Sequence, residues 1–372
     1  MIVWKSGCLA AASVAVVCAA TLTAPASAQK IDNSYICVFK KNAVAKEKVN
    51  EKAQNAANGH GQLKRVYKES LRGFAIAAAP QAIAKIKAKD PNIAYCEQDQ
   101  VMRIADVQAK AKPNRTVTQP AQSTPWGIAR VGARNYTGTG RAFVIDSGID
   151  LDHPDLNVDT GLSRSFTSER TADDGNGHGT HVAGTIAARN NSIGAIGVAA
   201  GARVVAIKVL TSSGSGSTSG VIAGVDYVAA TANSSDVANM SLGGGISQAL
   251  DDAVVAAASK GIPFVLAAGN DGANANNSSP ARANGANVYT VSAFSNGDRW
   301  ASFSNFANPP IDWAEPGVSI YSTYRGGGYA TLSGTSMAAP HLAGILLAGS
   351  VVADGTVIGD PDGIADRIGK LQ

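Results

Sequence analysis

From Pro125 onward the chain alternates short apolar runs with longer segments rich in glycine and alanine. Apolar runs of this kind are typical of strands that are buried on both faces of a parallel sheet. Together with the intervening helical segments they predict an α/β fold with a mostly parallel sheet, covered by helices on both faces. The expected strands are 142–145, 204–209, 237–240, 263–267 and 288–291, and the expected helices include 178–189, 219–232 and 246–260.

The composition agrees with a large, tightly packed domain of this class. The 372 residues are 45% hydrophobic and 16% charged, and 40 of them are glycine. Glycine allows close approach between backbones, so this content favours closely packed helices and strands. The length allows two or three domains.

The first 28 residues have the parts of a secretory signal peptide. Lys5 is the charged start, residues 9–20 are the apolar stretch, and Ala26-Ser27-Ala28 is a small-residue cleavage site. The alternative is a membrane anchor, but the apolar run is too short and too rich in alanine to span a bilayer comfortably. We therefore expect a secreted product, extracellular or periplasmic, without membrane attachment after signal removal.

Residues 30–104 follow a different pattern. Segments 35–40, 63–67, 73–78 and 93–97 are strand-like, and 43–58 and 81–89 are helical in composition. The order β-α-β-β-α-β is that of a small α+β, ferredoxin-like domain, in which the first and last strands are neighbours. Cys37 and Cys96 lie in those two strands, so they either pair in an exported protein or remain two small buried hydrophobic residues.

Charge is distributed unevenly between the two parts of the chain. Residues 29–120 contain 17 Lys and Arg against 8 Asp and Glu, a net charge of +9, whereas residues 121–372 contain 14 against 20, a net charge of −6. A basic segment followed by an acidic body indicates two parts that attract each other. A basic arm for nucleic acid is the alternative, but the lysines are interleaved with apolar residues rather than clustered. Residues 105–120 lack apolar periodicity and are expected to form an exposed linker.

Three motifs in the larger part carry the residue types of nucleophilic catalysis. Asp146 ends an apolar strand, His178 follows a glycine turn and begins a helix, and Ser336 stands at another helix start. Amide hydrolysis needs a nucleophile, a base that takes its proton and a group that orients the base. Ser336, His178 and Asp146 supply these roles, and the helix N-terminus behind Ser336 supplies a backbone N–H for the oxyanion. Asn270, after another apolar strand, can supply a second donor.

Each of these motifs has an ordinary structural explanation when taken alone. An acid after a strand is often a cap or turn residue, and Gly-Thr-Ser is often only a helix cap. Their joint occurrence in this order argues for catalysis. A lipase or esterase of the α/β-hydrolase type is excluded, because that class needs a Gly-x-Ser-x-Gly elbow and the order Ser, acid, His.

The segment from about Ala121 to Ala353 resembles the subtilisin-like serine peptidases, with several stretches most similar to the proteinase K branch. The resemblance rests on 144–148 (Val-Ile-Asp-Ser-Gly), 177–184 (Gly-His-Gly-Thr-His-Val-Ala-Gly) and 333–341 (Ser-Gly-Thr-Ser-Met-Ala-Ala-Pro-His), and on the chain order Asp, His, Ser. It implies a doubly wound α/β fold, the triad Asp146, His178 and Ser336, and Asn270 as oxyanion donor. The implied activity is serine-type endopeptidase.

The resemblance extends to substrate binding. It implies that 241–244 and 214–216 are two strands between which a peptide adds as a third strand, so that main-chain bonds provide affinity. Small residues beside the scissile bond imply a roomy apolar pocket that prefers hydrophobic side chains. A flexible loop is the alternative for 212–219. The substrate-binding residues expected in this way are Gly214, Ser215, Gly216, Ser241, Leu242, Gly243, Ala267 and Gly269.

Calcium is the metal that the resemblance implies. The family's site combines a glutamine near the mature N-terminus, an aspartate after the triad strand and a loop after the histidine helix. The corresponding ligands are the side chains of Gln122, Asp155 and Asn191 and the carbonyls of Arg189, Ile193 and Ala195. All-oxygen ligation suits Ca²⁺, and an ordinary turn is the alternative. Zinc at His178 and His181 is rejected because no third ligand is evident.

Residues 30–104 resemble the inhibitory propeptides of the same family, at 35–40 (Tyr-Ile-Cys-Val-Phe-Lys) and 94–99 (Ala-Tyr-Cys-Glu-Gln-Asp). The implied organisation is a signal at 1–28, an inhibitory and chaperoning propeptide at 29–104, a linker at 105–120 that contains or borders the maturation site, and a peptidase domain at 121–372. The cut is expected within about 105–121. The partners are then protein or peptide substrates and the chain's own propeptide, with no nucleic acid, and the peptidase is expected to be a monomer.

Two departures from the family pattern are visible. Glu315 stands in 312–317 (Asp-Trp-Ala-Glu-Pro-Gly) where a small residue is common, and only 36 residues follow Ser336. The second departure predicts shortened terminal packing elements. It is also the only support for the alternative function, a catalytically silent binding or scaffold protein that keeps the fold.

Overall fold

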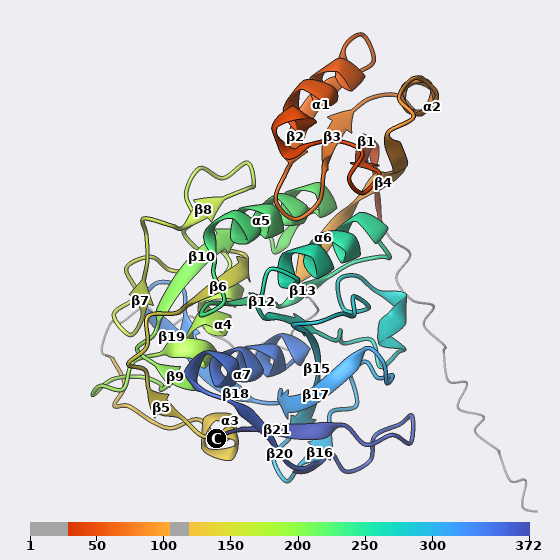
Figure 1. The fold of residues 1–372 in the computed structure, drawn as a ribbon. Helices are drawn as coiled ribbons and strands as arrows, with labels where there is room; N and C mark the ends of the chain where they lie inside the picture. The colour runs from red at the N-terminus through yellow and green to blue at the C-terminus, as the bar shows by residue number, and fades with distance from the viewer. Residues whose placement is uncertain (1–28, 105–118) are drawn as a thin grey trace, which may run out of the picture.

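The computed structural model describes residues 29–104 and 119–372, which form a small N-terminal unit seated on a larger α/β body (Figure 1). The expected signal peptide at 1–28 and most of the expected linker at 105–120 lie outside the described residues. None of the helices in the described ranges has both the length and the apolarity needed to cross a bilayer.

The N-terminal unit has the predicted order β-α-β-β-α-β. It consists of β1 (Lys30–Phe39), α1 (Val49–Ala57), β2 (Gln62–Tyr67), β3 (Gly73–Ala77), α2 (Pro80–Lys89) and β4 (Ile93–Ile104), with a short 3₁₀ turn at Lys46–Lys48. The strands form an antiparallel sheet in the order β2-β3-β1-β4. Both helices pack on one face of this sheet, where Phe74, Ile76 and Ile86 belong to a separate buried core.

A disulfide closes this unit. Cys37 and Cys96 are direct partners across the β1–β4 ladder, and their sulfur atoms are bonded. Of the two alternatives that the sequence left open, the structure therefore contains the disulfide rather than two separate thiols.

The body is built on one twisted sheet with the strand order β20-β21-β17-β15-β14-β12-β6-β10-β7. Along this order all neighbours from β7 to β21 are parallel, and the β20–β21 hairpin at the edge is antiparallel. Off this path, β16 pairs antiparallel with β15. The strands of this path are β6 (Arg141–Asp146), β7 (Asn157–Val158), β10 (Arg203–Lys208), β12 (Val237–Met240), β14 (Phe264–Ala267), β15 (Val288–Ser295), β17 (Ile311–Pro316), β20 (Val351–Thr356) and β21 (Arg367–Leu371).

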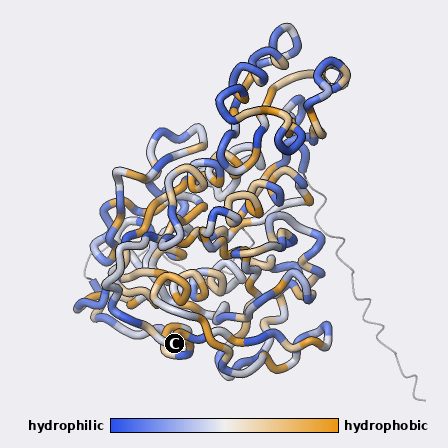
Figure 2. The backbone as a smooth tube through the Cα atoms, viewed as in Figure 1, coloured by the Kyte–Doolittle hydropathy of each residue, from blue (hydrophilic) through white to orange (hydrophobic). Residues whose placement is uncertain are grey.

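Helices cover both faces of this sheet, as predicted for a doubly wound fold. Alternate residues of β6 face opposite layers: Phe143 and Ile145 pack with α5 (Thr218–Thr231) and α6 (Gln248–Ala258), whereas Ala142 and Val144 pack with α4 (His178–Ala187) and α7 (Thr335–Ala348). Apolar segments accordingly run through the middle of the body, and polar segments lie on its outside (Figure 2).

Short elements complete the body. They are α3 (Trp126–Val131), β5 (Arg134–Asn135), β8 (Arg164–Ser165), β9 (Ala199–Ala200), β11 (Ser215–Ser217), β13 (Leu242–Gly243), a 3₁₀ turn at Ala275–Asn277, β16 (Arg299–Trp300), β18 (Ile320–Tyr324) and β19 (Gly328–Leu332). β8 pairs with β10, and β16 pairs with β15.

The three expected helices lie close to their predicted bounds. The helix α4 begins at the predicted His178, α5 begins one residue earlier than predicted and α6 two residues later, and each ends one or two residues sooner. The helices α5 and α6 start where Ser217 and Ser247 act as N-caps, each accepting a hydrogen bond from a backbone N–H three residues ahead. Residues after α7 form the β20–β21 hairpin, and β21 extends the main sheet by pairing with β17. The residues after α7 thus supply packing elements, and whether these are shortened relative to the family stays a prediction.

Candidate active site

The first part of the site is a hydrogen-bonded pair at the end of β6. Asp146 is the last residue of this strand, and its Oδ1 lies 2.8 Å from His178 Nδ1. Both side chains are buried, with 0% and 2% of their surface exposed. A buried carboxylate facing Nδ1 favours the tautomer with the proton on that nitrogen, which leaves Nε2 as a base.

His178 is positioned by a glycine turn. Gly177 has φ of +108°, and a Cβ atom on it would meet the Tyr324 ring at 2.4 Å. The turn therefore requires glycine, and it allows α4 to begin directly at His178. Within the described residues, His178 Nε2 has no hydrogen-bond partner.

Ser336 lies in the first turn of α7 and is fully buried. Its Oγ donates to the carbonyl oxygen of Ser241 at 3.2 Å instead of to His178. The structure therefore places Asp146 against His178, while the Ser336 hydroxyl is turned toward a neighbouring carbonyl. Contacts between a candidate nucleophile and base are often long or absent before substrate binds.

Asn270 follows β14 and lies beside the nucleophile. Its Oδ1 accepts hydrogen bonds from the backbone N–H and the hydroxyl of Thr335, both at 2.8 Å. These bonds fix the amide plane next to the residue that precedes Ser336. A Cβ on Gly334 would lie only 3.0 Å from Asn270 Nδ2, so glycine is needed for the two segments to approach.

In this structure the two expected substrate strands pair with a segment of the same chain, the end of β4. This strand runs antiparallel to β11 on one side, with Gly216 opposite Met102, and to β13 on the other, with Leu242 opposite Ile104. The N–H of Ile104 also donates to the Gly214 carbonyl at 3.1 Å. Five of the eight expected residues therefore contact a bound strand: Gly214, Ser215, Gly216, Leu242 and Gly243.

The other three expected residues occupy different positions. Ser241 precedes β13, and its carbonyl accepts from Ser336 Oγ, so it borders the nucleophile. Ala267 ends β14 and is buried. Gly269 donates its N–H to Thr335 Oγ1, and its carbonyl accepts from the N–H of Asn305.

Two further histidines near the site are buried and structural. Burial, together with the charge of His178, lowers the pKa of His181 to about 3, and burial lowers the pKa of His341 to about 4. His181 Nε2 contacts the Ile320 carbonyl at 3.0 Å. His178 Nδ1 is held by Asp146.

The six expected calcium ligands lie together around Asp155. Asn191 Nδ2 contacts Asp155 Oδ1 at 2.8 Å, Gln122 Nε2 contacts the Arg189 carbonyl at 3.4 Å, and the N–H of Ala195 reaches Asp155 Oδ2 at 3.2 Å. The remaining member, Ile193, pairs with Ala121 as an isolated bridge. In the described ranges no three His, Cys, Asp or Glu side chains gather as a metal cluster. The expected calcium set itself contains a single carboxylate, that of Asp155.

The chemistry of this set fits a hard cation. Both amide groups direct nitrogen at oxygen atoms that are themselves expected ligands, and rotating an amide by 180° exchanges its nitrogen for oxygen. The pKa of Asp155 is raised because the effect of burial exceeds that of the hydrogen bonds from Ala195, Asn191 and Tyr329, which lower it. A buried carboxylate surrounded by amide and carbonyl oxygens matches the donors that Ca²⁺ prefers.

The small unit contacts the body through carboxylates at helix starts. Asp99 accepts from the N–H and the hydroxyl of Ser219 in the first turn of α5. Glu97 accepts from the hydroxyl of Ser247 and from the N–H of Ala249 at the start of α6. Acidic groups are favoured at helix N-termini, so these contacts stabilise the docked arrangement.

In return, Asp226 of α5 binds the loop between β2 and β3. It accepts from the backbone N–H groups of Lys68, Glu69 and Ser70 and from the Ser70 hydroxyl. Asp226 does not stand out in the sequence, because an acid on a helix surface has no local pattern that distinguishes docking from solvation. Asp99, on β4, is the last residue of the propeptide-like stretch 94–99.

Comparison with known proteins places these features in one family. Residues 143–348 match the model of the subtilase family, peptidase S8, and residues 34–105 match that of peptidase inhibitor I9. The two models cover, respectively, the α/β body with its candidate site and the small unit docked on it.

Curated relatives agree. Subtilisin E of Bacillus subtilis is 40% identical over 323 residues, covering 84% of this chain and 79% of that protein. The M-protease of Shouchella clausii is 44% identical over 284 residues, covering 74% and 68%. Alkaline serine exoprotease A of Vibrio alginolyticus is 42% identical over 296 residues, but the match spans 52% of that longer protein.

A solved structure described as a cold adapted subtilisin-like serine proteinase is also similar. It is 40% identical, has a TM-score of 0.58, and the match covers 66% of this chain and 98% of that one. The sequence, the doubly wound sheet and the paired residues at its carboxyl edge thus agree, and the chain belongs to the subtilase family of serine endopeptidases, with an I9-type propeptide unit at its N-terminal side.

Proposed function

We propose that this chain is the precursor of a secreted, self-maturing serine endopeptidase with Ser336 as nucleophile, His178 as base and Asp146 as the group that orients the base. The observation that carries the proposal is the position of β4. This strand is paired on both edges like a bound peptide, and its end at Ile104 lies opposite Leu242, one residue from the Ser241 carbonyl that Ser336 contacts.

In the proposed reaction, Ser336 Oγ turns to His178 Nε2, gives up its proton and bonds to the carbonyl carbon of the substrate. The tetrahedral oxyanion is stabilised by the Ser336 backbone N–H and the Asn270 side chain. The C–N bond then breaks as His178 returns the proton to the leaving amine, which leaves an acyl-enzyme. Water repeats the sequence and releases the acid. Asp146 stabilises the imidazolium at each step through the contact to Nδ1.

The register of β4 points to the maturation bond. Leu242 pairs with Ile104 and Gly243 with Arg103. Ser241, the residue before Leu242, is the one whose carbonyl accepts from Ser336 Oγ. We infer that the first cut follows Ala105, within the expected range 105–121, and that later trimming brings the mature N-terminus closer to Ala121.

The same strand explains how the propeptide inhibits. After cleavage, β4 remains paired with β11 and β13, and the contacts of Glu97, Asp99 and Asp226 hold it there. A peptide strand that fills the substrate position excludes other substrates. The docked unit also fixes the starts of α5 and α6, which supports the expected role as a folding chaperone for a body whose contacts are largely non-local.

Calcium is proposed as a structural ion. When bound, it would supply positive charge for the buried carboxylate of Asp155, with Gln122, Asn191 and the carbonyls of Arg189, Ile193 and Ala195 as further ligands. This set links the segment before α3, the loop after α4 and the loop after β6. Its role is to hold these segments together, and no step of the reaction passes through it.

Three further proposals concern secretion, substrate preference and oligomeric state. Secretion rests on the signal pattern of residues 1–28, a preference for hydrophobic side chains before the scissile bond rests on the small residues Ala267 and Gly269, and the expected monomer rests on the family resemblance. The competing proposal, a catalytically silent scaffold, would leave the Asp146–His178 pair without a use.

The test is hydrolysis of casein by the protein secreted from the full chain, compared with Ser336→Ala and with Ser333→Ala as a control at a nearby serine. We expect digestion by the wild type and by the control, and a loss of at least about 10³-fold with Ser336→Ala because the nucleophile is gone. Equal digestion by all three proteins would refute the assigned nucleophile. No digestion by any folded protein would favour the scaffold.

A further inference from the structure

A buried lysine lies next to the catalytic aspartate, and the reaction described above does not use it. Lys208 ends β10 and is paired with Asp146 across the parallel β6–β10 ladder. Its side chain has no exposed surface, and its Nζ donates to the carbonyl oxygen of Ser147, the residue that follows Asp146. A buried ammonium is costly unless it is paired, so its partner is informative.

The partner is Glu169. Its Oε2 lies 2.9 Å from Lys208 Nζ, and its Oε1 accepts from the backbone N–H and the hydroxyl of Ser212 at 2.8 and 2.9 Å. Burial acts to raise the pKa of Glu169, but the hydrogen bonds from Ser212 and Lys208 outweigh it and lower the pKa. One carboxylate therefore joins the strand end beside Asp146 to the loop that precedes the substrate-pairing strand β11.

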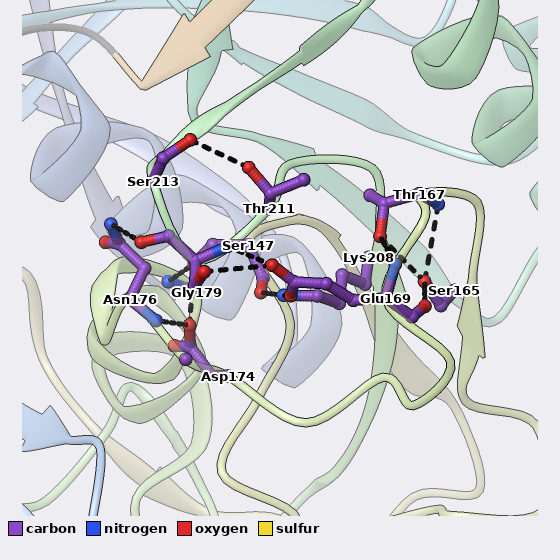
Figure 3. Close-up of polar contacts among 12 residues, drawn as sticks. Ser147, Ser165, Thr167, Glu169, Asp174, Asn176, Gly179, Lys208, Thr211 and Ser213 are labelled. Carbon is purple, nitrogen blue, oxygen red and sulfur yellow. Dashed lines mark hydrogen bonds and ion pairs between the residues drawn. The ribbon is translucent and has the colours of Figure 1, made fainter.

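Glu169 is itself held in a compact turn. Its carbonyl accepts from the Ser165 hydroxyl at 2.6 Å, and its N–H donates to Thr167 Oγ1 at 3.0 Å. Figure 3 shows Ser165 and Thr167 on one side of the Glu169–Lys208 pair and Ser147 on the other. The carboxylate is thus presented by a fixed backbone rather than by a free surface loop.

The loop from Thr211 to Ser215 has few other anchors. Inside the loop, the Thr211 N–H donates to the Ser215 carbonyl at 2.9 Å and the Gly214 N–H to the Thr211 carbonyl at 2.8 Å. Outside it, Asn176 Nδ2 donates to the Ser212 carbonyl at 3.1 Å. Glu169 also binds Ser212, through the hydrogen bonds to its N–H and hydroxyl. Gly214, whose carbonyl accepts from the Ile104 N–H, lies two residues after Ser212.

The opposite end of the network reaches the helix that carries His178. The Ser147 hydroxyl donates to Asp174 Oδ1 and accepts from the Gly179 N–H (Figure 3). Asp174 also accepts from the backbone N–H and the hydroxyl of Thr180 through its Oδ2. The backbone after Asp146 is therefore fixed between Lys208 on one side and the start of α4 on the other.

We propose that Glu169 and Lys208 are positioning residues of the peptidase: this ion pair ties the substrate-pairing loop 211–215 to the backbone that follows the catalytic Asp146. The proposal rests on the proposed function. It assigns neither residue a contact with the reacting atoms. Glu169 acts on substrate through the loop, and Lys208 acts on the Asp146–His178 pair through the Ser147 carbonyl.

The first experiment needs no activity. Amide hydrogen exchange is measured on the full chain carrying Ser336→Ala, which prevents self-cleavage, with and without Glu169→Ala. The reporters are the amides of Thr211 and Gly214, whose acceptors lie within the loop and do not include Glu169. We expect both to exchange about tenfold faster, because the loss of hydrogen bonds to a charged acceptor weakens the loop by about that factor. Amides of β12 should not change.

The second experiment measures kcat and KM of the enzyme matured from the full chain. One substrate is a long peptide that spans β11 and β13, and the other is a single-residue ester that does not reach β11. Glu169→Ala should raise KM about tenfold for the long peptide only, since the ester makes no bonds to the loop. Glu169→Gln, which keeps an acceptor but loses the charge, should restore much of this loss. Lys208→Met should lower kcat for both substrates.

Arg203→Met is the matched control. It removes a cation from the other end of β10, where Arg203 lies 3.7 Å from Asp159, and it should leave exchange and kinetics unchanged. Lys208→Met replaces a buried ion-pair member by an apolar side chain of similar length, a change that folds often tolerate. If it does not fold, the two Glu169 variants still decide the proposal.

Unchanged exchange at Thr211 and Gly214 in Glu169→Ala would overturn the proposal, as would an equal KM increase for the long peptide and the ester. If the wild type cleaves neither substrate, the proposed function fails, but the exchange comparison still shows whether Glu169 holds the loop. Faster exchange together with a KM effect confined to the long peptide supports the positioning role.

Discussion

At the scale of single residues, Glu315 has surroundings that conflict with its chemistry. It is fully buried in β17, and within residues 29–104 and 119–372 neither carboxylate oxygen has a hydrogen-bond partner. A Cβ on Gly369 of β21 would lie 2.2 Å from Glu315 Oε1, so the carboxyl group packs directly against this strand. Burial raises the pKa of Glu315 well above its usual value, partly offset by the charge of Arg130.

This raised pKa makes stability depend on pH. Below the ordinary pKa of about 4.5, Glu315 is neutral in both states, so its ionisation does not change the free energy of unfolding. As pH rises above this pKa, only the unfolded state ionises, so the free energy of unfolding falls by up to about 1.4 kcal/mol per pH unit until the raised pKa is reached. Glu315→Gln should therefore match the wild type at pH 4 and become increasingly more stable toward pH 8. Urea unfolding of both proteins in the Ser336→Ala background measures this difference. Parallel curves across that pH range would show that Glu315 is ionised when folded.

Asn270 carries a second prediction at this scale. Asn270→Leu removes the side-chain donor for the oxyanion, so kcat should fall by about 10²–10³, the range found for the corresponding donor in subtilisin, a member of this family. KM should change little, because the donor is used mainly in the transition state. Steady-state kinetics on a peptide amide test this prediction. A rise in KM at constant kcat would instead assign Asn270 to ground-state binding.

At the scale of elements, the loop after α4 is held through the buried side chain of Asp155. Asp155 is buried and is reached by Asn191, by the Ala195 N–H and by the Tyr329 hydroxyl. If a cation replaces these hydrogen bonds, its removal destabilises the segment that joins α4 to the start of the body.

Chelation therefore should lower the melting temperature of the matured enzyme, and added Ca²⁺ should restore it, because a ligand that binds only the folded state stabilises that state. Asp155→Asn should lower the melting temperature and remove the response to chelator. Differential scanning calorimetry with and without EDTA provides the measurement. A melting curve that EDTA leaves unchanged would rule out a structural calcium ion.

At this scale, sequence patterns predicted most elements, and the misses have physical causes. Apolar runs located β6, β10, β12, β14 and β15, since buried parallel strands are continuous in hydrophobicity. The starts of α5 and α6 differ from the predicted ones because the caps Ser217 and Ser247 fix them. Ser217 lies in the serine-rich segment 212–219, where one serine is weak evidence for a cap. The β20–β21 hairpin was not predicted, because β20 is largely exposed and lacks a buried face.

At the scale of the whole molecule, the charge imbalance correctly indicated two parts that associate, but not how. The basic unit approaches the acidic body with its carboxylates Glu97 and Asp99, which face helix N-termini rather than basic side chains. A count of charged side chains does not include helix dipoles, which arise from the backbone. For the candidate site, motifs predicted Asp146, His178, Ser336 and Asn270, and their catalytic roles stay predictions. The Glu169–Lys208 pair could not be predicted from motifs, because only the fold brings its two members together. The assignment to the proteinase K branch stays a prediction.

The central claim is that Ser336 cuts the chain that contains it, at the end of β4. The most direct measurement is intact mass spectrometry of the secreted full chain and of Ser336→Ala, produced side by side in a host lacking other proteases. We predict that the wild type yields a new N-terminus at Asp106 first and shorter forms later, while Ser336→Ala remains uncut after the signal. Identical cleavage of both proteins, or a folded wild type that is never cut, would contradict the account.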